Sequence, residues 1–360
     1  MRILDRYLLR EFVTYLTLGL VGFIVIYAVV DVIEKLGSFL DHRATFVLIA
    51  TYYANLVPKI VVQMMPVALL LATFLALGQL NKFGELTAMR AAGISIVRIL
   101  VPVFGVAAVC AVATLLLSEF VVPRAARECN DILNRRIQQM QNLRGIERTD
   151  LTYLGQGGRI WYMRLYIVPE RRMHEVTLQE FKQGVLVRRI DASEATWDGS
   201  RWVFVSGVKR TFDAGGREIA ESFPRLAVGG LAESPEDFSR DDIRPEEMNW
   251  FELSAYIQRL RSSGARVANY LVDLHMKLAF PVICVVVVLI GGALATRLRM
   301  QSAALGFGLS IAIAILYYAV MRAGQALGHN GAMPPYLAAW MGDAIFGAVG
   351  LWMLRLAQKS

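Results

Sequence analysis

The sequence predicts a polytopic α-helical membrane protein whose six transmembrane helices are split three and three by a water-soluble, strand-rich insertion. Six stretches are apolar and long enough to cross a bilayer, whereas the long segment between the third and the fourth is charged and alternates in short runs. Of the 360 residues, 56% are apolar and only 19% are charged. Soluble domains hold about 45–50% apolar and ~25% charged residues, so the composition favours a membrane protein.

Each apolar stretch has the length of a membrane-crossing helix. About 20 residues rising ~1.5 Å each cover a ~30 Å hydrocarbon core. The six stretches are residues 12–30, 60–81, 99–118, 278–296, 300–321 and 335–354. Five contain no charged residue, and the sixth contains only Asp343. The first stretch is too long for a signal-peptide core and lacks a following cleavage site, so we expect an uncleaved signal anchor.

The basic residues near the helix ends predict the orientation. One side of the predicted bundle holds ten: Arg2, Arg6, Arg10, Lys82, Arg90, Arg98, Arg297, Arg299, Arg355 and Lys359. The other side holds four: Lys35, Arg43, Lys59 and Arg322. Because basic residues concentrate on the cytoplasmic side, we expect both termini in the cytoplasm and the insertion in the periplasm of a Gram-negative cell. The net charge of +8 therefore indicates topology rather than nucleic-acid binding.

These patterns divide the chain into three parts. Residues 1–122 hold the first three helices, with a short cytoplasmic helix at about 82–93. Residues 123–247 form the periplasmic domain, a helical stalk followed by β-structure at about 145–240. Residues 248–360 hold an amphipathic connector helix, capped by an Asn and carrying an apolar stripe, and the last three helices. Whether the connector lies on the membrane, binds a partner or is simply packed stays open.

Runs of period two, separated by Gly- and Asp-rich turns, predict antiparallel strands in the insertion. Such short, regularly spaced strands are typical of a sandwich or an open barrel. Ten apolar residues are expected to face inward: Ile160, Tyr162, Leu165, Ile167, Val176, Leu178, Phe181, Val203, Val205 and Phe212. This surface either forms a sealed core or, if one edge is open, a track for acyl chains.

Catalytic motifs are missing from the sequence. The dipeptide Gly-Lys does not occur, which excludes a P-loop, and neither G-x-S-x-G nor H-E-x-x-H is present. The four histidines are scattered, and the three cysteines form no framework. We therefore expect no enzyme activity, cofactor or metal of the chain's own. Asp343 alone is a weak indication of a proton relay.

The cytoplasmic link between the second and third spans has helix-forming residues that end at Gly93. Five of its residues are candidates for contact with another protein: Phe83, Glu85, Leu86, Met89 and Arg90. A short helix with apolar and charged groups on one face suits a protein groove. From the residues alone, a solvated interfacial loop is the alternative.

Five segments resemble one known family, the lipopolysaccharide export permeases of the LptF/LptG type. They are residues 4–12 (LDRYLLREF), 31–36 (DVIEKL), 84–93 (GELTAMRAAG), 119–123 (EFVVP) and 333–340 (MPPYLAAW). Their order and spacing span nearly the whole chain. The first segment, together with YIQRL at 256–260, favours the LptG-like branch.

The resemblance implies the transmembrane half of an ABC transporter. Its partners would be an LptB-like cytoplasmic ATPase dimer and a second permease half, either an LptF-like paralogue or a second copy. The insertion would be a β-jellyroll that receives lipopolysaccharide extracted from the inner membrane. It would pass that lipid to LptC- and LptA-like jellyrolls toward the outer membrane. A secondary lipid transporter and an ABC-type mechanotransmission protein are the alternative functions.

The resemblance also suggests roles for individual residues. The five residues of the cytoplasmic link would couple the chain to the ATPase. The basic residues at the outer rim would bind lipid: Lys35, Arg43, Arg135, Arg136 and Arg322. Five apolar residues of the insertion would form the periplasmic lipid track: Tyr162, Leu165, Ile167, Leu178 and Phe181. Some family members carry Lys where this chain has Asp31, and Lys35 lies one helical turn further out. Each basic residue could alternatively be an interfacial side chain or part of a surface ion pair.

Overall fold

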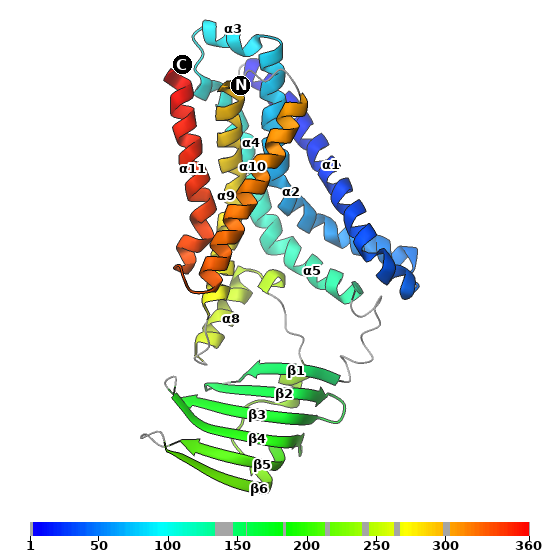
Figure 1. The fold of residues 1–360 in the computed structure, drawn as a ribbon. Coiled ribbons are helices and arrows are strands. Elements are labelled where there is room, and N and C mark those ends of the chain that lie inside the picture. Colours follow the sequence, from blue (N-terminus) through cyan, green and yellow to red (C-terminus); the bar gives the residue numbers. More distant parts are fainter. Residues whose placement is uncertain are drawn as a thin grey trace. The chain divides into compact units, whose positions relative to one another are not determined.

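The chain forms two compact units, one helical and one built on a β-sheet (Figure 1). The computed structural model describes residues 3–133, 147–155, 157–182, 185–212, 217–239, 245–262, 267–297 and 303–359. The helical unit comprises Met1–Cys129, Pro245–Trp250 and Ala268–Ser360. The sheet unit comprises Asn130–Arg244 and Phe251–Val267.

Six helices in the described part of the chain are long and apolar enough to span a membrane, which confirms the predicted three-and-three arrangement. Their elements are α1 (Ile3–Asp41), α2 (Phe46–Lys82), α4 (Ile96–Leu116), α9 (Ala268–Arg297), α10 (Ala303–His329) and α11 (Pro335–Lys359). The third span continues from α4 through the π-helical turn η1 (Leu117–Val121) into α5 (Val122–Asp131). The short helix α3 (Glu85–Ala91) lies between the second and third spans.

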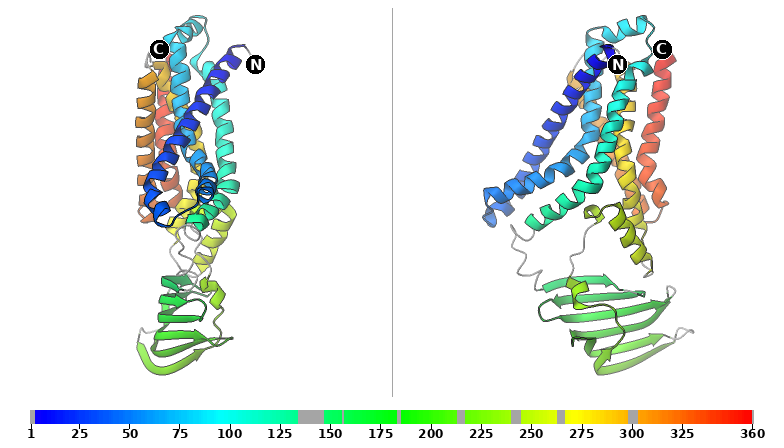
Figure 2. Two further views of the ribbon diagram at one scale, coloured as in Figure 1. Left: turned by 90° about the vertical axis from the view of Figure 1, so that its right-hand side faces the viewer. Right: turned by 180° about the vertical axis from the view of Figure 1, so that it is seen from behind.

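Helices α2 and α9 run among the other spans of the bundle (Figure 2), and both carry many buried residues. Two glycines of α9 allow close approach to the neighbouring helices. A Cβ added at Gly291 of α9 would lie 2.9 Å from Leu70 Cδ1 of α2. At the next residue, Gly292, the added Cβ would lie 2.9 Å from Leu100 Cδ2 of α4. Small residues at a helix crossing let backbones approach, and close packing is what holds membrane helices together.

The outer helices leave wide apolar faces uncovered. Helix α1 exposes aliphatic side chains along most of its length: Val13, Leu18, Val21, Val25, Ile26, Val29, Val30, Ile33, Leu36 and Leu40. A water-soluble surface rarely carries so long an apolar stripe. This face therefore requires lipid or another apolar protein surface as its environment.

The bundle has two distinct ends (Figure 1). Both chain termini and α3 lie at one end, and the turn between α1 and α2 lies at the other. An even number of crossings requires this placement of the termini.

The second unit contains one six-stranded sheet with each strand hydrogen-bonded to the next along the chain, in the order β1 to β6. All five pairings are antiparallel. The strands are β1 (Glu147–Leu154), β2 (Arg159–Ile167), β3 (Arg172–Lys182), β4 (Val185–Trp197), β5 (Trp202–Phe212) and β6 (Glu218–Val228). This confirms antiparallel β-structure between the third and fourth spans, as one continuous sheet.

A tight turn between β4 and β5 fixes their register. The Asp198 carboxylate accepts backbone N–H bonds from Ser200 and Arg201, at 3.0 and 2.9 Å. These bonds hold the pKa of Asp198 well below its usual range. The turn pairs Trp197 with Trp202 across the two strands.

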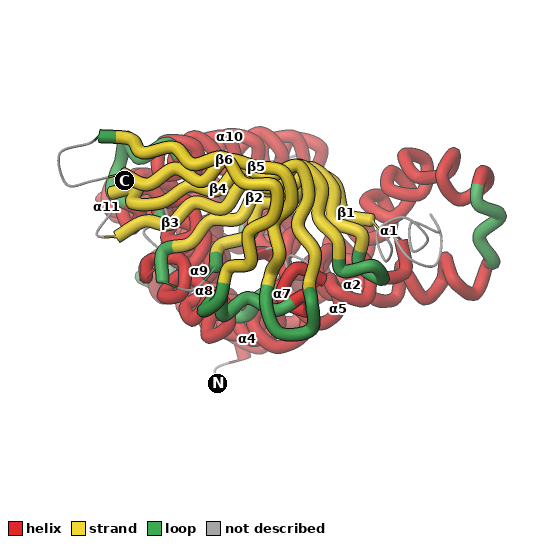
Figure 3. Tube along the Cα trace, turned by 90° about the horizontal axis from the view of Figure 1, so that it is seen from below, coloured by secondary structure: helices red, strands yellow, loops and turns green. Residues whose placement is uncertain are grey.

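A crease crosses the sheet, and the strands are visibly bent (Figure 3). Asp150 in β1, Glu175 in β3 and Ser206 in β5 have positive φ angles of 52°, 48° and 49°. At each of them the ladder skips one residue pair. Such irregularities bend a strand and redirect its side chains.

The crease shifts the alternation of β2 by one residue, and the prediction placed its four β2 residues on the wrong face on both sides of this shift. In β2 the fully buried residues are Trp161 and Met163 before the crease and Tyr166 after it. The predicted residues alternate with these and therefore lie on the opposite face: Ile160, Tyr162, Leu165 and Ile167. Tyr162 is 42% exposed and donates to Asp150 Oδ1 at 3.1 Å, which raises the pKa of its hydroxyl.

The other strands agree better with the prediction. Val176 and Leu178 are buried in the core as expected. Val203 is buried, but it alternates with the core residues Trp202 and Phe204 and therefore lies on the opposite face. Phe181 is half-buried beside the shift in register between Glu180 and Phe181.

Substituting Gly291 tests the close packing of α2 against α9. The substitution Gly291→Leu should lower the free energy of unfolding by about 1–3 kcal/mol, because the added side chain overpacks the helix crossing. It should lower the temperature at which the detergent-solubilised chain loses helical circular dichroism. The control is Gly105→Leu, because a Cβ at Gly105 meets nothing within 4 Å. Equal shifts in the two variants would contradict the close approach.

Candidate functional site

The short helix α3 is bounded by two glycines and anchored by its own apolar face. Gly84 has φ 72° and Gly93 has φ 82°, backbone conformations that side chains disfavour. Leu86 is only 2% exposed, and Met89 packs beside it on the bundle core. The expectation that Leu86 belongs to an outward docking face is therefore wrong. So short a helix needs its apolar residues to attach it to the bundle.

The exposed part of this segment combines one aromatic ring with charges. Phe83 is 68% exposed, Arg90 is exposed and Glu85 is half-buried. The Tyr7 hydroxyl of α1 donates to Glu85 Oε1 at 3.4 Å.

A second contact from α1 holds the far side of the same segment. Arg98, in the first turn of α4, donates to Asp5 Oδ2 of α1 at 3.0 Å. The first turns of α1 therefore contact the chain on both sides of α3. The sequence alone does not reveal this contact, because residues more than 90 positions apart carry no local signal.

At the opposite end of the bundle, Lys35 lies in a polar cluster between α1 and α2. Its Nζ forms an ion pair with Asp31 and donates to the Tyr52 hydroxyl at 2.8 Å. The Tyr53 hydroxyl donates to Asp31 Oδ2 at 2.9 Å. The Lys35 side chain is 25% exposed. Lys35 is thus part of an ion pair, the alternative that the sequence left open, while its side chain stays partly exposed.

The other predicted lipid-binding cations are placed differently. Arg43 is exposed in the turn after α1, at φ 48°. Arg322 is exposed on α10 and donates to Gln325 Oε1 at 2.9 Å. Arg135 and Arg136 lie outside the described residues.

Glu119 forms a junction that the sequence did not reveal. It lies in the π-helical turn η1 at the end of the third span. Its Oε2 accepts the backbone N–H of Trp250 at 2.6 Å, where helix α8 (Trp250–Ser262) begins. Its Oε1 lies 3.4 Å from Lys277 Nζ of α9. One carboxylate thus joins the points where the chain leaves the bundle and returns to it.

The concave face of the sheet is filled with aromatic side chains. Trp161 and Trp202 have ring centroids 5.8 Å apart, and Trp161 stacks on Phe204 at the same distance. Phe238 of helix α7 (Pro235–Ser239) packs among them and is fully buried, as is the predicted track residue Leu178. No sequence pattern indicated Phe238, because α7 lies outside every alternating run.

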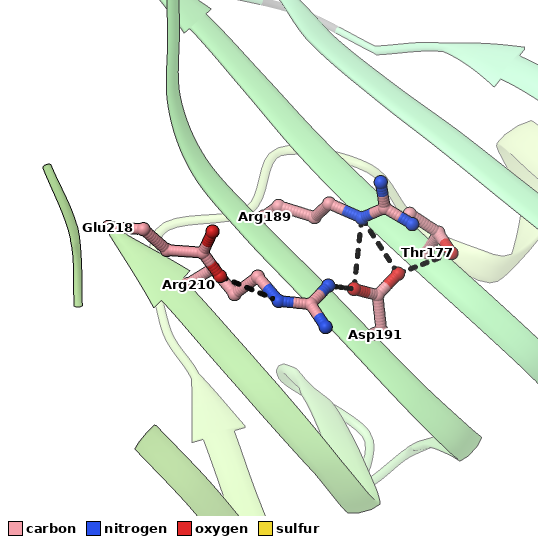
Figure 4. Close-up of polar contacts among 5 residues, drawn as sticks. All are labelled: Thr177, Arg189, Asp191, Arg210 and Glu218. Atoms are coloured by element: carbon pink, nitrogen blue, oxygen red, sulfur yellow. Dashed lines mark hydrogen bonds and ion pairs between the residues drawn. The ribbon is translucent and has the colours of Figure 1, made fainter. Parts of the chain in front are cut away.

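The opposite face carries a network of charges (Figure 4). Asp191 of β4 accepts from the Arg189 Nε at 2.9 Å, and it pairs with Arg210 of β5. Thr177 of β3 donates to the same carboxylate at 2.9 Å, and Glu218 of β6 lies 3.0 Å from Arg210. Two carboxylates balance two guanidinium groups. We assign this network to cross-strand stabilisation of β3 to β6.

The intramembrane carboxylate also has a partner. The Tyr317 hydroxyl of α10 donates to Asp343 Oδ1 of α11 at 2.6 Å, and both residues are buried. Within the described ranges, no group of three or more His, Cys, Asp or Glu side chains is placed to hold a metal ion.

Comparison with known proteins agrees with this architecture. Residues 6–356 match the model of one family, described as "Lipopolysaccharide export system permease LptF/LptG". The chain is 20% identical over 355 residues to the lipopolysaccharide export system permease protein LptG of Escherichia coli K12, covering 98% of each chain. It is 21% identical over 360 residues to the protein of the same name from Haemophilus influenzae, again covering 98% of each chain.

The Glu119 junction can be tested by a double-mutant cycle with Lys277. Both side chains are 14% exposed, so removing one charge leaves the other largely buried. Glu119→Leu and Lys277→Leu should each lower the free energy of unfolding by about 2–4 kcal/mol. The double variant should be less destabilised than the sum of the two, by about 1–3 kcal/mol. Thermal unfolding in detergent measures all three variants, and strictly additive effects would show that the two charges do not interact.

Proposed function

We propose a function for this chain from the premise that it belongs to the lipopolysaccharide export system permease LptF/LptG family. It is accordingly a multipass inner-membrane permease of lipopolysaccharide export. The observation that carries this conclusion is the family match over residues 6–356, on a bundle of six spans interrupted by a β-sheet after the third.

The chain acts as one transmembrane half of an ATP-driven transporter. The end of the bundle that carries both termini and α3 faces the cytoplasm, because ten basic residues flank the helices there. The sheet unit is then periplasmic. The uncovered apolar face of α1 serves a second permease half, an LptF-like paralogue or another copy, and the lipid between the two halves.

A cytoplasmic LptB-like ATPase dimer docks on the α3 segment. Phe83 supplies an exposed ring, and Glu85 and Arg90 supply opposite charges. Leu86 and Met89 attach the segment to the core, so a displacement of α3 reaches the bundle. Tyr7 and Arg98 link the same segment to α1.

Lipopolysaccharide enters from the outer leaflet of the inner membrane, where its phosphates meet cations at the far end of the bundle. Arg43 and Arg322 are exposed there, and a guanidinium group binds phosphate strongly. Lys35 also takes part, because its ammonium group releases the Asp31 carboxylate and binds a lipid phosphate instead. The aromatic face of the sheet then receives acyl chains and passes the lipid on to LptC- and LptA-like jellyrolls.

Reversing one charge on α3 tests the coupling. Glu85→Lys places a cation where the ATPase is expected to supply one, so binding of the ATPase should fall at least about tenfold, the factor that ~1.4 kcal/mol carries. Co-purification of the ATPase with the tagged permease measures it. Thr87→Lys is the matched control, because Thr87 is exposed on the same helix. Unchanged co-purification of the Glu85 variant would refute docking through this residue.

Removing the rim cations tests the lipid site. The triple variant Lys35→Ala/Arg43→Ala/Arg322→Ala should capture at least about tenfold less lipopolysaccharide, because even one charged hydrogen bond to phosphate contributes about 1.5–3 kcal/mol. A photoreactive amino acid is substituted for Ile33, which is 67% exposed on α1. The amount of lipopolysaccharide crosslinked to it measures the capture. The control is Arg297→Ala/Arg355→Ala, which removes charge at the opposite end of the bundle. Equal capture by the triple variant and the parent would exclude the rim site.

A further inference from the structure

The interior of the curved sheet is filled by a residue from outside the sheet. Phe238 of α7 is fully buried, and its ring centroid lies 4.8 Å from that of Tyr153, 5.2 Å from Trp161, 6.0 Å from Tyr166 and 5.6 Å from Trp202. These four rings come from β1, β2 and β5. Strands β2 and β5 have two strands between them in the sheet, so their rings meet Phe238 only because the sheet curves.

Two buried donors hold the backbone of residues 230–239, which we call the strap. The Tyr166 hydroxyl donates to the Pro235 carbonyl at 3.0 Å, and the Trp202 Nε1–H donates to the Glu233 carbonyl at 2.9 Å. The strap contributes no strand to the sheet. Its helix has five residues, too few to stay folded away from the sheet. The strap can therefore leave without breaking the ladder of backbone hydrogen bonds between the strands.

The strap also brings a carboxylate into the sheet unit. Glu233 Oε1 lies 3.1 Å from Arg159 Nε, and their side chains are 2% and 14% exposed. Arg159 also donates to the Gly230 carbonyl at 3.1 Å. A Cβ at Gly155 would overlap the Glu233 carboxylate, so only glycine leaves room for it there. A carboxylate this deeply buried is stable only while it is paired.

From this arrangement we infer that the strap is an exchangeable occupant of a binding site for an anionic amphiphile. Phe238 takes the place of an acyl chain among the aromatic rings, and Glu233 takes the place of a phosphate on Arg159. An incoming phosphate competes well for Arg159, because its oxygens match the guanidinium fork. An incoming acyl chain replaces the apolar contacts of Phe238. This inference rests on the proposed function and adds a step to it, because lipid enters the sheet only when the strap leaves.

The alternative is that the strap is a permanent part of the core. The two cases differ in how the strap responds to an amphiphile of matching chemistry. Hydrogen exchange of the strap separates them when the full chain, reconstituted in phospholipid nanodiscs, is mixed with dodecyl phosphate. Dodecyl maltoside, which is neutral, and inorganic phosphate, which has no chain, are the comparison probes.

An exchangeable strap predicts faster exchange with dodecyl phosphate only. Exchange of strap peptides should rise about tenfold while β2 to β5 stay protected, and a diazirine form of the probe should label peptides that contain Trp161 or Trp202. Glu233→Gln should raise strap exchange without any probe, because the ion pair with Arg159 is lost. The matched control is Glu236→Gln, because Glu236 belongs to the same strap and is exposed.

Two results would overturn the inference. One is strap exchange that dodecyl phosphate leaves unchanged in both the parent and Glu233→Gln. The other is a loss of protection in the strap and all strands together, which marks the strap as core. Phe238→Ala adds a check, because an opened site should take up more probe while a damaged core should unfold.

Repeating the labelling experiment with photoreactive lipopolysaccharide tests strap exchange and lipopolysaccharide passage separately. If dodecyl phosphate releases the strap but photoreactive lipopolysaccharide never labels the same peptides, the strap is exchangeable and passage of lipopolysaccharide is wrong. If lipopolysaccharide labels Trp161 while strap exchange stays constant, passage stands and the exchange inference fails.

Discussion

A bilayer offers no water to the polypeptide backbone, and this constraint organises the rest of the chain. Each N–H and C=O group within hydrocarbon needs a partner in its own segment, which a continuous helix supplies. Two polar side chains in the spans are paired in the same way. Thr73 donates to the Leu69 carbonyl at 2.7 Å, and Tyr317 donates to Asp343. Among the described strands, β1 and β6 are the edges of an open sheet, and hydrocarbon does not tolerate an open sheet edge, so the sheet occurs as an insertion outside the spans.

Long continuous helices also connect the two ends of the bundle. Helix α1 runs through 39 residues, about 58 Å at ~1.5 Å per residue. Its first turns contact the α3 segment through Tyr7 and Asp5, and its last turns carry Asp31 and Lys35. The close packing of α2 against α9 gives this helix a rigid neighbour. A displacement at the proposed ATPase surface would therefore reach the proposed lipid rim along one helix.

The sheet unit depends on its curvature in the same way that the bundle depends on close packing. Positive φ angles at Asp150, Glu175 and Ser206 bend the strands. The bend brings Trp161 of β2 to within 5.8 Å of Trp202 of β5, centroid to centroid. This aromatic interior holds Phe238, so an element that adds no strand still completes the core. The opposite face needs no cover, because Asp191 and its neighbours pair their charges there.

The sequence by itself determined the six spans, the place of the insertion and its antiparallel strands. Hydropathy over ~20 residues and alternation of period two are local properties that a chain displays before it folds. Tertiary structure alone decided which side chains of these elements are buried, exposed or paired with a distant residue. Leu86 turned inward because α3 must be attached to the bundle, and Lys35 acquired Asp31 and Tyr52 as partners. Tyr162 lies outside because it alternates with the buried Trp161 and Met163. Phe238 lies inside because the curved sheet brings the rings of β1, β2 and β5 around it. Contacts between residues far apart in the chain leave no periodic trace in its sequence.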